Sequence, residues 1–184
     1  MRTVSKLLAA ALLATALASA APAAAQVNIN TPHHGHRPMQ LDLHGGFTWW
    51  GFGFAGGARF GIPIVENGFI DSLNNAFYIN FGADFYFIRN RHGGRDAYDP
   101  GFGIPVTAHW EFYFSETWSL FGEIGANVFF HPAFLRGDRG FFEHDYLGAW
   151  FIGAVGARLH IGDHFGLVLR VGNPYSAFGF TFFI

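Results

Sequence analysis

Residues 165–184 read FGLVLRVGNPYSAFGFTFFI, two similar stretches joined at Asn173-Pro174. Large apolar residues take every second position from Phe165 to Val171 and again from Phe178 to Ile184. The positions between them are mostly small or polar and include one charged residue, Arg170. Alternation with a period of two on both sides of a tight turn is typical of a β-hairpin with one apolar face.

The same alternation recurs through most of the preceding chain. It predicts further strands at about 41–52, 54–64, 77–88, 102–114, 118–130 and 147–161. With the closing hairpin this makes eight strands in a chain of 184 residues, a length that suits one domain. We therefore predict an all-β fold, an eight-stranded antiparallel up-and-down barrel over residues 41–184, with the last strand pairing against residues 41–52.

Charged residues within these strands all fall on the polar face. Together with two histidines on that face they form the predicted barrel-interior network: Asp42, Arg59, Asp84, His109, Glu111, Glu123, Arg158, His160 and Arg170. The four acids and three arginines nearly balance, as buried charges require. We expect Arg170 to point toward an acid such as Glu111 or Glu123.

Two kinds of barrel fit such a pattern. A transmembrane barrel turns its apolar face to lipid, whereas a secreted, soluble, lipocalin-like lipid carrier turns it inward. Charged residues make up 13% of this chain, against about 25% in soluble domains. Since the polar face also lacks lysine, we favour the membrane barrel, and in a barrel of eight strands we expect side chains to fill the lumen.

The first 25 residues resemble a secretory signal peptide. Arg2 and Lys6 precede an apolar run, and Ala23-Ala24-Ala25 forms a cleavage site before Gln26. Removal of residues 1–25 leaves nine arginines, no lysine and thirteen acids, a net charge of −4. This charge and the lack of a basic patch argue against a nucleic-acid partner.

A polar, histidine-containing linker is predicted over residues 26–40. His33, His34 and His36 are residue types that bind zinc or copper, but a linker lacks the fixed geometry of a metal site. We therefore predict a solvated segment, with no metal and no cofactor.

The connections between strands differ in length. Short turns at 115–117 and 162–164 suit the periplasmic side, and long polar segments at 89–101 and 131–146 suit extracellular loops. The loop 131–146 combines aromatic residues with arginines that suit phosphate groups. Its candidate contacts with lipopolysaccharide or a surface partner are Arg136, Arg139, Phe141, Phe142 and Tyr146.

On the signal peptide, the eight alternating strands and the final YSAFGFTFFI, the chain resembles the small outer-membrane β-barrels of Gram-negative bacteria, of the OmpA/OmpX type. The resemblance implies residence in the outer membrane, contact with its lipid and lipopolysaccharide, and a monomeric state. It also implies recognition of the C-terminal strand by the outer-membrane assembly machinery. Phe178, Phe180 and Phe182 match the pattern of such strands, whereas the last residue is Ile184 where the family has Phe.

Some barrels of this kind are enzymes that modify the acyl chains of lipid A. His109, Glu111 and Ser119 lie on neighbouring predicted strands, and a nucleophilic triad needs a serine, a histidine and an acid within hydrogen-bond reach. A polar interior network explains the same residues without catalysis. We therefore predict a non-enzymatic barrel with a structural, anchoring or surface-interaction role, and keep the lipid-modifying enzyme as the alternative.

Overall fold

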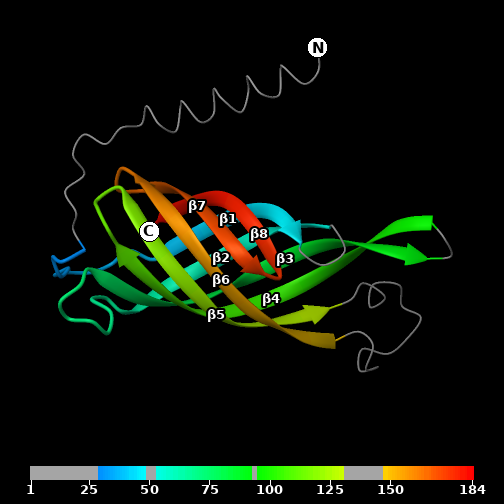
Figure 1. Ribbon diagram of the computed structural model, residues 1–184, viewed down its shortest axis with the longest axis horizontal. Helices are drawn as coiled ribbons and strands as arrows, with labels where there is room; N and C mark the ends of the chain where they lie inside the picture. Colours follow the sequence, from blue (N-terminus) through cyan, green and yellow to red (C-terminus); the bar gives the residue numbers. More distant parts are fainter. Residues whose placement is uncertain (1–28, 49–52, 93–94, 131–146) are drawn as a thin grey trace, which may run out of the picture.

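The computed structural model describes residues 29–48, 53–92, 95–130 and 147–184, and its strands close into one antiparallel barrel (Figure 1). The strands are β1 (Gln40–Thr48), β2 (Phe54–Val65), β3 (Asn75–His92), β4 (Arg95–Tyr113), β5 (Trp118–Phe130), β6 (Leu147–Ile161), β7 (Phe165–Asn173) and β8 (Tyr175–Phe183). Each strand pairs with its neighbours in sequence, and β8 pairs with β1. The predicted eight-stranded up-and-down barrel is confirmed, while the predicted signal peptide, 1–25, lies outside the described residues.

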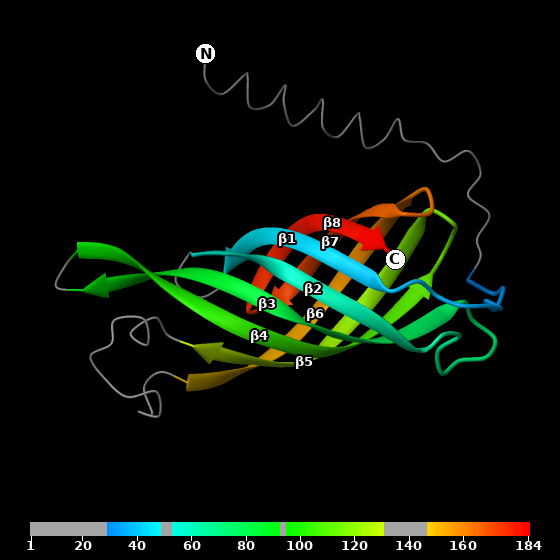
Figure 2. The ribbon, with the colours of Figure 1, turned by 180° about the vertical axis from the view of Figure 1, so that it is seen from behind.

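The two ends of the barrel differ. At one end, here called the proximal end, lie residues 29–39, the connection 66–74, the turns 114–117 and 162–164, and the C-terminus (Figures 1 and 2). At the other, the distal end, β3 and β4 extend beyond the rest of the barrel. These two strands have 18 and 19 residues, against 9 in each of β1, β7 and β8.

The prediction of a loop at 89–101 is wrong, because most of this segment belongs to β3 and β4. The two strands pair with each other as far as His92 and Arg95, whereas the pairing of β2 with β3 starts at Phe54 and Phe87. Charged residues and Pro100 suggested a loop, but the strand pairing shows that β3 and β4 continue as a two-stranded ribbon past the end of β2.

The barrel closes where β1 meets β8, as predicted. Leu41 lies opposite Phe182 and Gly45 opposite Phe178. The backbone of Met39 and Ile184 continues the ladder with two hydrogen bonds, of 3.0 and 2.9 Å. The seam is therefore paired along its whole described length, and no strand edge is left open there.

Prolines within the strands have two different effects on the register. Pairing of β2 with β3 shifts between Pro63 and Val65, which is the bulge expected where proline removes a ladder hydrogen bond. Pro105 pairs with Asn127 in an unshifted register. On its other side, the pairing of β4 with β3 passes from Val106–Phe81 to Gly103–Asp84 without Pro105 and Ile104, so the ladder is interrupted there while the register is kept.

The outer wall of the barrel is apolar. Among its large apolar side chains Phe47 is 66% exposed, Val155 65% and Phe151 61%, whereas every in-strand charge predicted to face inward is at most 5% exposed. This is the reverse of the soluble carrier arrangement, in which the apolar face lines the cavity. No helix in the described part of the chain is long and apolar enough to cross a membrane.

Inward-facing glycines allow the strands to approach closely at the seam. A Cβ added to Gly179 of β8 would lie 2.1 Å from the backbone oxygen of Leu43 in β1. A Cβ added to Gly122 of β5, on the outer wall, would meet no atom within 4 Å.

Substitution Gly179→Ala should therefore destabilise the barrel by about 1–3 kcal/mol, because a backbone atom must move to admit the methyl group. Gly122→Ala is the matched control and should leave the free energy of unfolding nearly unchanged. Urea unfolding of the barrel in detergent or bilayers measures both. Equal stabilities of the two variants would contradict the close approach at the seam.

Candidate functional site: the buried charge network

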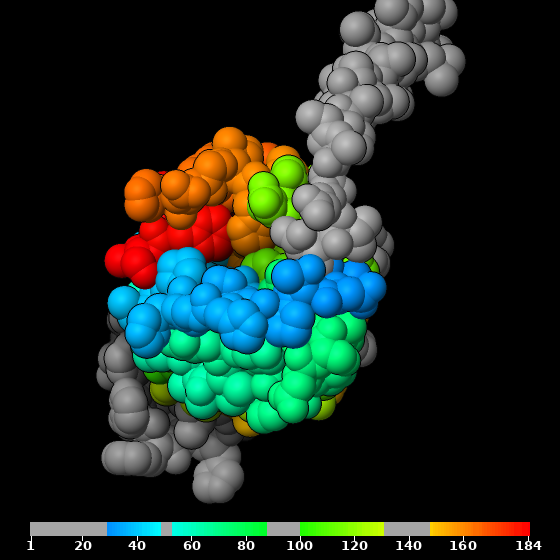
Figure 3. Space-filling model, turned by 90° about the vertical axis from the view of Figure 1, so that its left-hand side faces the viewer, coloured from blue at the N-terminus to red at the C-terminus, as the bar shows by residue number. Residues whose placement is uncertain are grey.

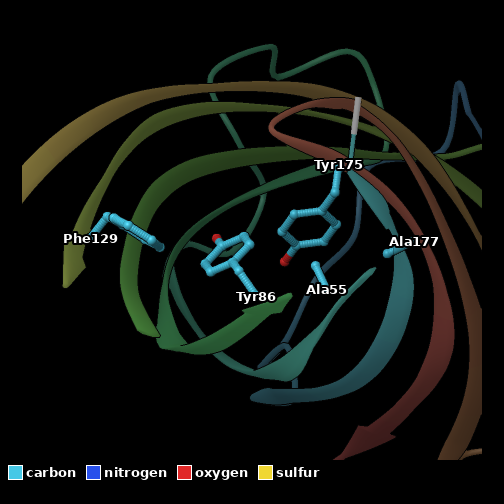
Figure 4. Close-up of a cluster of buried hydrophobic side chains, with 5 residues drawn as sticks. All are labelled: Ala55, Tyr86, Phe129, Tyr175 and Ala177. Carbon is cyan, nitrogen blue, oxygen red and sulfur yellow. The ribbon is translucent and has the colours of Figure 1, made fainter. Parts of the chain in front are cut away.

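The barrel interior is filled in layers along its axis. Near the distal end lies an aromatic cluster in which Tyr86 contacts Phe129, Trp150 and Tyr175, with ring centroids 5.7, 5.7 and 5.9 Å apart. Figure 4 shows the rings of Tyr86 and Tyr175 inside the circle of strands. At the proximal end the hydroxyls of Tyr78 and Tyr113 are hydrogen bonded at 3.0 Å. The charged residues lie between these two groups.

Glu123 lies at the centre of the charged layer. Its carboxylate accepts hydrogen bonds from Arg59 at 3.1 Å and from Arg170 at 2.8 and 3.0 Å. It also lies 2.9 Å from the ring of His109 and 3.3 Å from the amide of Asn80. Four strands, β2, β3, β4 and β7, thus supply donors to one carboxylate on β5.

Asp42 and Glu111 share the guanidinium of Arg158. Its Nη2 donates to Asp42 at 3.2 Å and its Nη1 to Glu111 at 2.5 Å. Asp42 also accepts from Arg170 at 3.2 Å and from Thr181 at 2.7 Å. Since Asp42 lies on β1, Thr181 on β8 and Arg158 on β6, these hydrogen bonds cross the closing seam from inside.

A second group of donors surrounds Asp84. Arg59 donates to it at 3.3 Å, and the hydroxyls of Tyr86 and Tyr175 donate at 3.1 and 2.7 Å. His44 Nε2 lies 3.1 Å from the same carboxylate. Arg59 contacts both Asp84 and Glu123, so the two groups form one continuous network.

His109 supplies the fourth positive charge of the network. Its Nδ1 lies 2.9 Å from Glu123 and its Nε2 3.4 Å from Glu111. Ionised carboxylates only accept hydrogen bonds, so an imidazolium with two N–H donors is the form that satisfies both contacts. Three arginines and this imidazolium then balance the four acids, as a buried ionic group requires. His44, by contrast, faces a carboxylate with one nitrogen only, and its Nδ1 has no partner among the described residues.

The residues of the possible triad are close together but in the wrong order. Ser119 donates to Glu111, and Glu111 in turn lies beside His109. A catalytic triad places histidine between serine and acid, whereas here the acid is in the middle. Ser119 is also fully buried and lies 3.0 Å from a different histidine, His160. The Nε2 of His160 also lies 4.0 Å from Glu111, so His160 adjoins the network at its proximal edge.

Sequence reasoning identified the charged members but missed several neutral ones, namely Gln40, His44, Asn80, Tyr86, Tyr175 and Thr181. Each sits on the polar face of its strand, so alternation was an available signal. The sequence predicted that Arg170 points toward an acid such as Glu111 or Glu123. Arg170 contacts Glu123, and it also contacts Asp42, which was not predicted.

Residues 29–39 lie against the proximal end rather than extending away from it. The backbone of His33 donates to Asn67 at 3.0 Å, and the backbone oxygen of Ile29 accepts from Asn74 at 2.7 Å. Burial lowers the pKa of His33, and a hydrogen bond to Glu66 raises the pKa of the exposed His36. Within the described residues, no three histidine or acidic side chains are placed to hold a metal ion.

The loop residues Arg136, Arg139, Phe141, Phe142 and Tyr146 lie outside the described part of the chain. Their assignment as surface contacts stays a prediction.

Comparisons with known proteins give little. No protein-family model matches the chain, and no curated protein is similar to it in sequence. Among solved structures, the outer membrane protein Ail of Yersinia pestis, in a phospholipid bilayer nanodisc, is similar at 15% sequence identity. The match covers 81% of this chain and 100% of that chain, with a TM-score of 0.45.

Replacing His109 by leucine should destabilise the barrel by about 3–5 kcal/mol, because Glu111 and Glu123 then share one cation too few. Adding Glu123→Gln removes one acid, so that three cations again balance three acids. We expect the double variant to be more stable than His109→Leu alone by about 1 kcal/mol or more, as measured by urea unfolding.

His44→Leu is the matched control, because His44 contacts Asp84 and not Glu123. It reaches Glu123 indirectly, through Asp84 and Arg59, so the coupling of His44→Leu to Glu123→Gln should be smaller than that of His109→Leu. If His109→Leu coupled to Glu123→Gln no more strongly than His44→Leu does, His109 would not be the balancing cation.

Proposed function

We propose that this protein is a non-enzymatic β-barrel of the bacterial outer membrane. The supporting observation is the division of side chains: large apolar groups cover the outside of the barrel, and the in-strand charges are buried inside. Lipid offers no hydrogen-bond partners, so a chain that crosses it by strands must close its sheet and keep its charges off the outer wall. Strands of 9 residues or more are long enough for a tilted crossing of about 9–11 residues.

The orientation follows from the connections. The proximal end carries tight turns between β4 and β5 and between β6 and β7, which suits the periplasmic side. The distal end, with the long β3–β4 hairpin and the segment 131–146, then faces outward. Assembly would use β8, whose Phe178, Phe180 and Phe182 all face the outer wall.

The role we propose is structural: a monomeric barrel that anchors and displays its distal segments at the cell surface. The filled interior supports this role over transport, because aromatic, ionic and tyrosine layers follow one another along the axis. The order of Ser119, Glu111 and His109 supports it over catalysis. The segment 131–146 supplies the aromatic and arginine residues for contact with lipopolysaccharide or a partner.

Val155→Arg tests the membrane setting. A charge at this exposed site of the outer wall should cost about 2–4 kcal/mol near the bilayer midplane and lower the yield of folded barrel in the membrane fraction. Thr117→Arg, in an exposed proximal turn, is the control and should have no such effect. Equal recovery of both variants, or recovery of the unaltered protein from the periplasm without detergent, would overturn the proposal.

Deletion of residues 136–143 tests the role of the distal segment. The barrel should still fold, as shown by a heat-dependent shift in gel mobility, because no described strand is altered. Adhesion of cells to surfaces and resistance to detergents should fall. Unchanged adhesion and unchanged detergent resistance would contradict the proposed role of the segment. If, in addition, mass spectrometry showed different acyl chains in outer-membrane lipid from cells with and without the protein, the enzyme would be supported instead.

A further inference from the structure

The proximal end contains a polar pocket of about 310 Å³ at the mouth of the barrel. Its lining comes from residues 29–39, from the 66–74 connection, from β1, β3, β4, β6 and β8, and from both proximal turns. Figure 3 looks onto this end, where residues 29–48 run across the middle with the 66–74 connection on one side and β6–β8 on the other. The pocket lies outside the charged layer and takes no part in the role proposed above.

Arg37 provides the positive charge of the pocket. Its guanidinium lies 3.9 Å from the centre of the Tyr113 ring, and it donates to the backbone oxygen of Glu66 at 3.2 Å and to Asn74. All of these partners are neutral groups, and no described carboxylate forms an ion pair with Arg37. Because these partners are neutral, no described group balances the charge of the guanidinium. Its Nη1 group can therefore donate hydrogen bonds to the carboxylate of a ligand.

Negative charge comes from the two proximal turns. Glu116 lies in the turn between β4 and β5, and Asp163 lies in the turn between β6 and β7, two strands further round the barrel. Neither forms an ion pair within the described residues. The pocket therefore has Arg37 and Glu116 near the end of β4, and a second acid, Asp163, further round the ring of strands.

The floor of the pocket includes an unpaired acceptor. Gln40 is 2% exposed, and its Nε2 donates to Glu111 at 2.9 Å, which fixes the orientation of the amide. Its Oε1 has no hydrogen-bond partner among the described residues. A buried acceptor is rarely left unpaired, so this oxygen calls for a donor. His33, whose lowered pKa keeps it neutral, adds no second positive charge beside Arg37.

We propose that this pocket binds a small zwitterion of the amino acid or short peptide class. The carboxylate lies against Arg37, and the ammonium group lies toward Asp163 and the Gln40 side of the floor. A purely anionic ligand would face the two acids, and a purely cationic one would face Arg37, whereas a zwitterion satisfies both sides. The volume is at the lower end of the range for small-molecule sites, which suits a dipeptide.

Titration of the full-length barrel in detergent with L-alanyl-L-alanine, followed by NMR, tests this proposal. We expect a Kd on the order of 1 mM or tighter. N-acetyl-alanyl-alanine lacks the ammonium group and alanyl-alanine amide lacks the carboxylate, and each should bind about tenfold more weakly. Arg37→Gln and Asp163→Asn should each weaken binding of the dipeptide to a similar extent.

Asp71→Asn is the matched control, because Asp71 is an exposed acid at the same end that does not line the pocket. It should leave the Kd unchanged. If the acetylated peptide bound as tightly as L-alanyl-L-alanine, the proposed contact of the ammonium group would be wrong. If the amide bound as tightly, the proposed contact of the carboxylate with Arg37 would be wrong. Absence of dipeptide binding to the folded, unaltered protein would overturn the site itself, whatever the role of the barrel in the membrane.

Discussion

The ionic network inside the barrel is the interaction on which the rest of the structure depends. Arg59, Arg158, Arg170 and His109 each contact two acids, and these acids lie on β1, β3, β4 and β5. A slip of one residue in any pair of strands would turn these groups outward and the apolar groups inward. The network and the apolar wall therefore specify the same register from opposite sides of the sheet.

Such a network specifies the structure more than it stabilises it. Removing ions from water costs several kcal/mol each, and the cost is offset only where every partner is present. Glu123, with donors from four other strands, meets this condition only after the whole barrel has closed. We infer that a partly assembled barrel, with unpaired charges, is strongly disfavoured, which makes closure cooperative.

The sequence predicted the strands, the closing seam and the direction of each in-strand charge, because all three follow from alternation with a period of two. It did not predict which charges meet. Asp42 and Arg158 are 116 residues apart, and their contact depends on the tilt and stagger of strands around the barrel, which no single strand encodes. The error at 89–101 has another cause, since composition alone does not distinguish a loop from a pair of strands that extends beyond its neighbours.

The filled interior also determines where function can reside. The cluster around Tyr86, the charged layer and the Tyr78–Tyr113 pair occupy successive levels of the barrel and are buried within it. Because large apolar side chains cover the described outer wall, we expect a site for a polar partner at one of the two ends. At the proximal end Arg37 rests on Tyr113, a member of the filled interior, so a ligand at the mouth contacts a rigid support. The same side chains that close the lumen thus provide the base on which an end-facing site can be built.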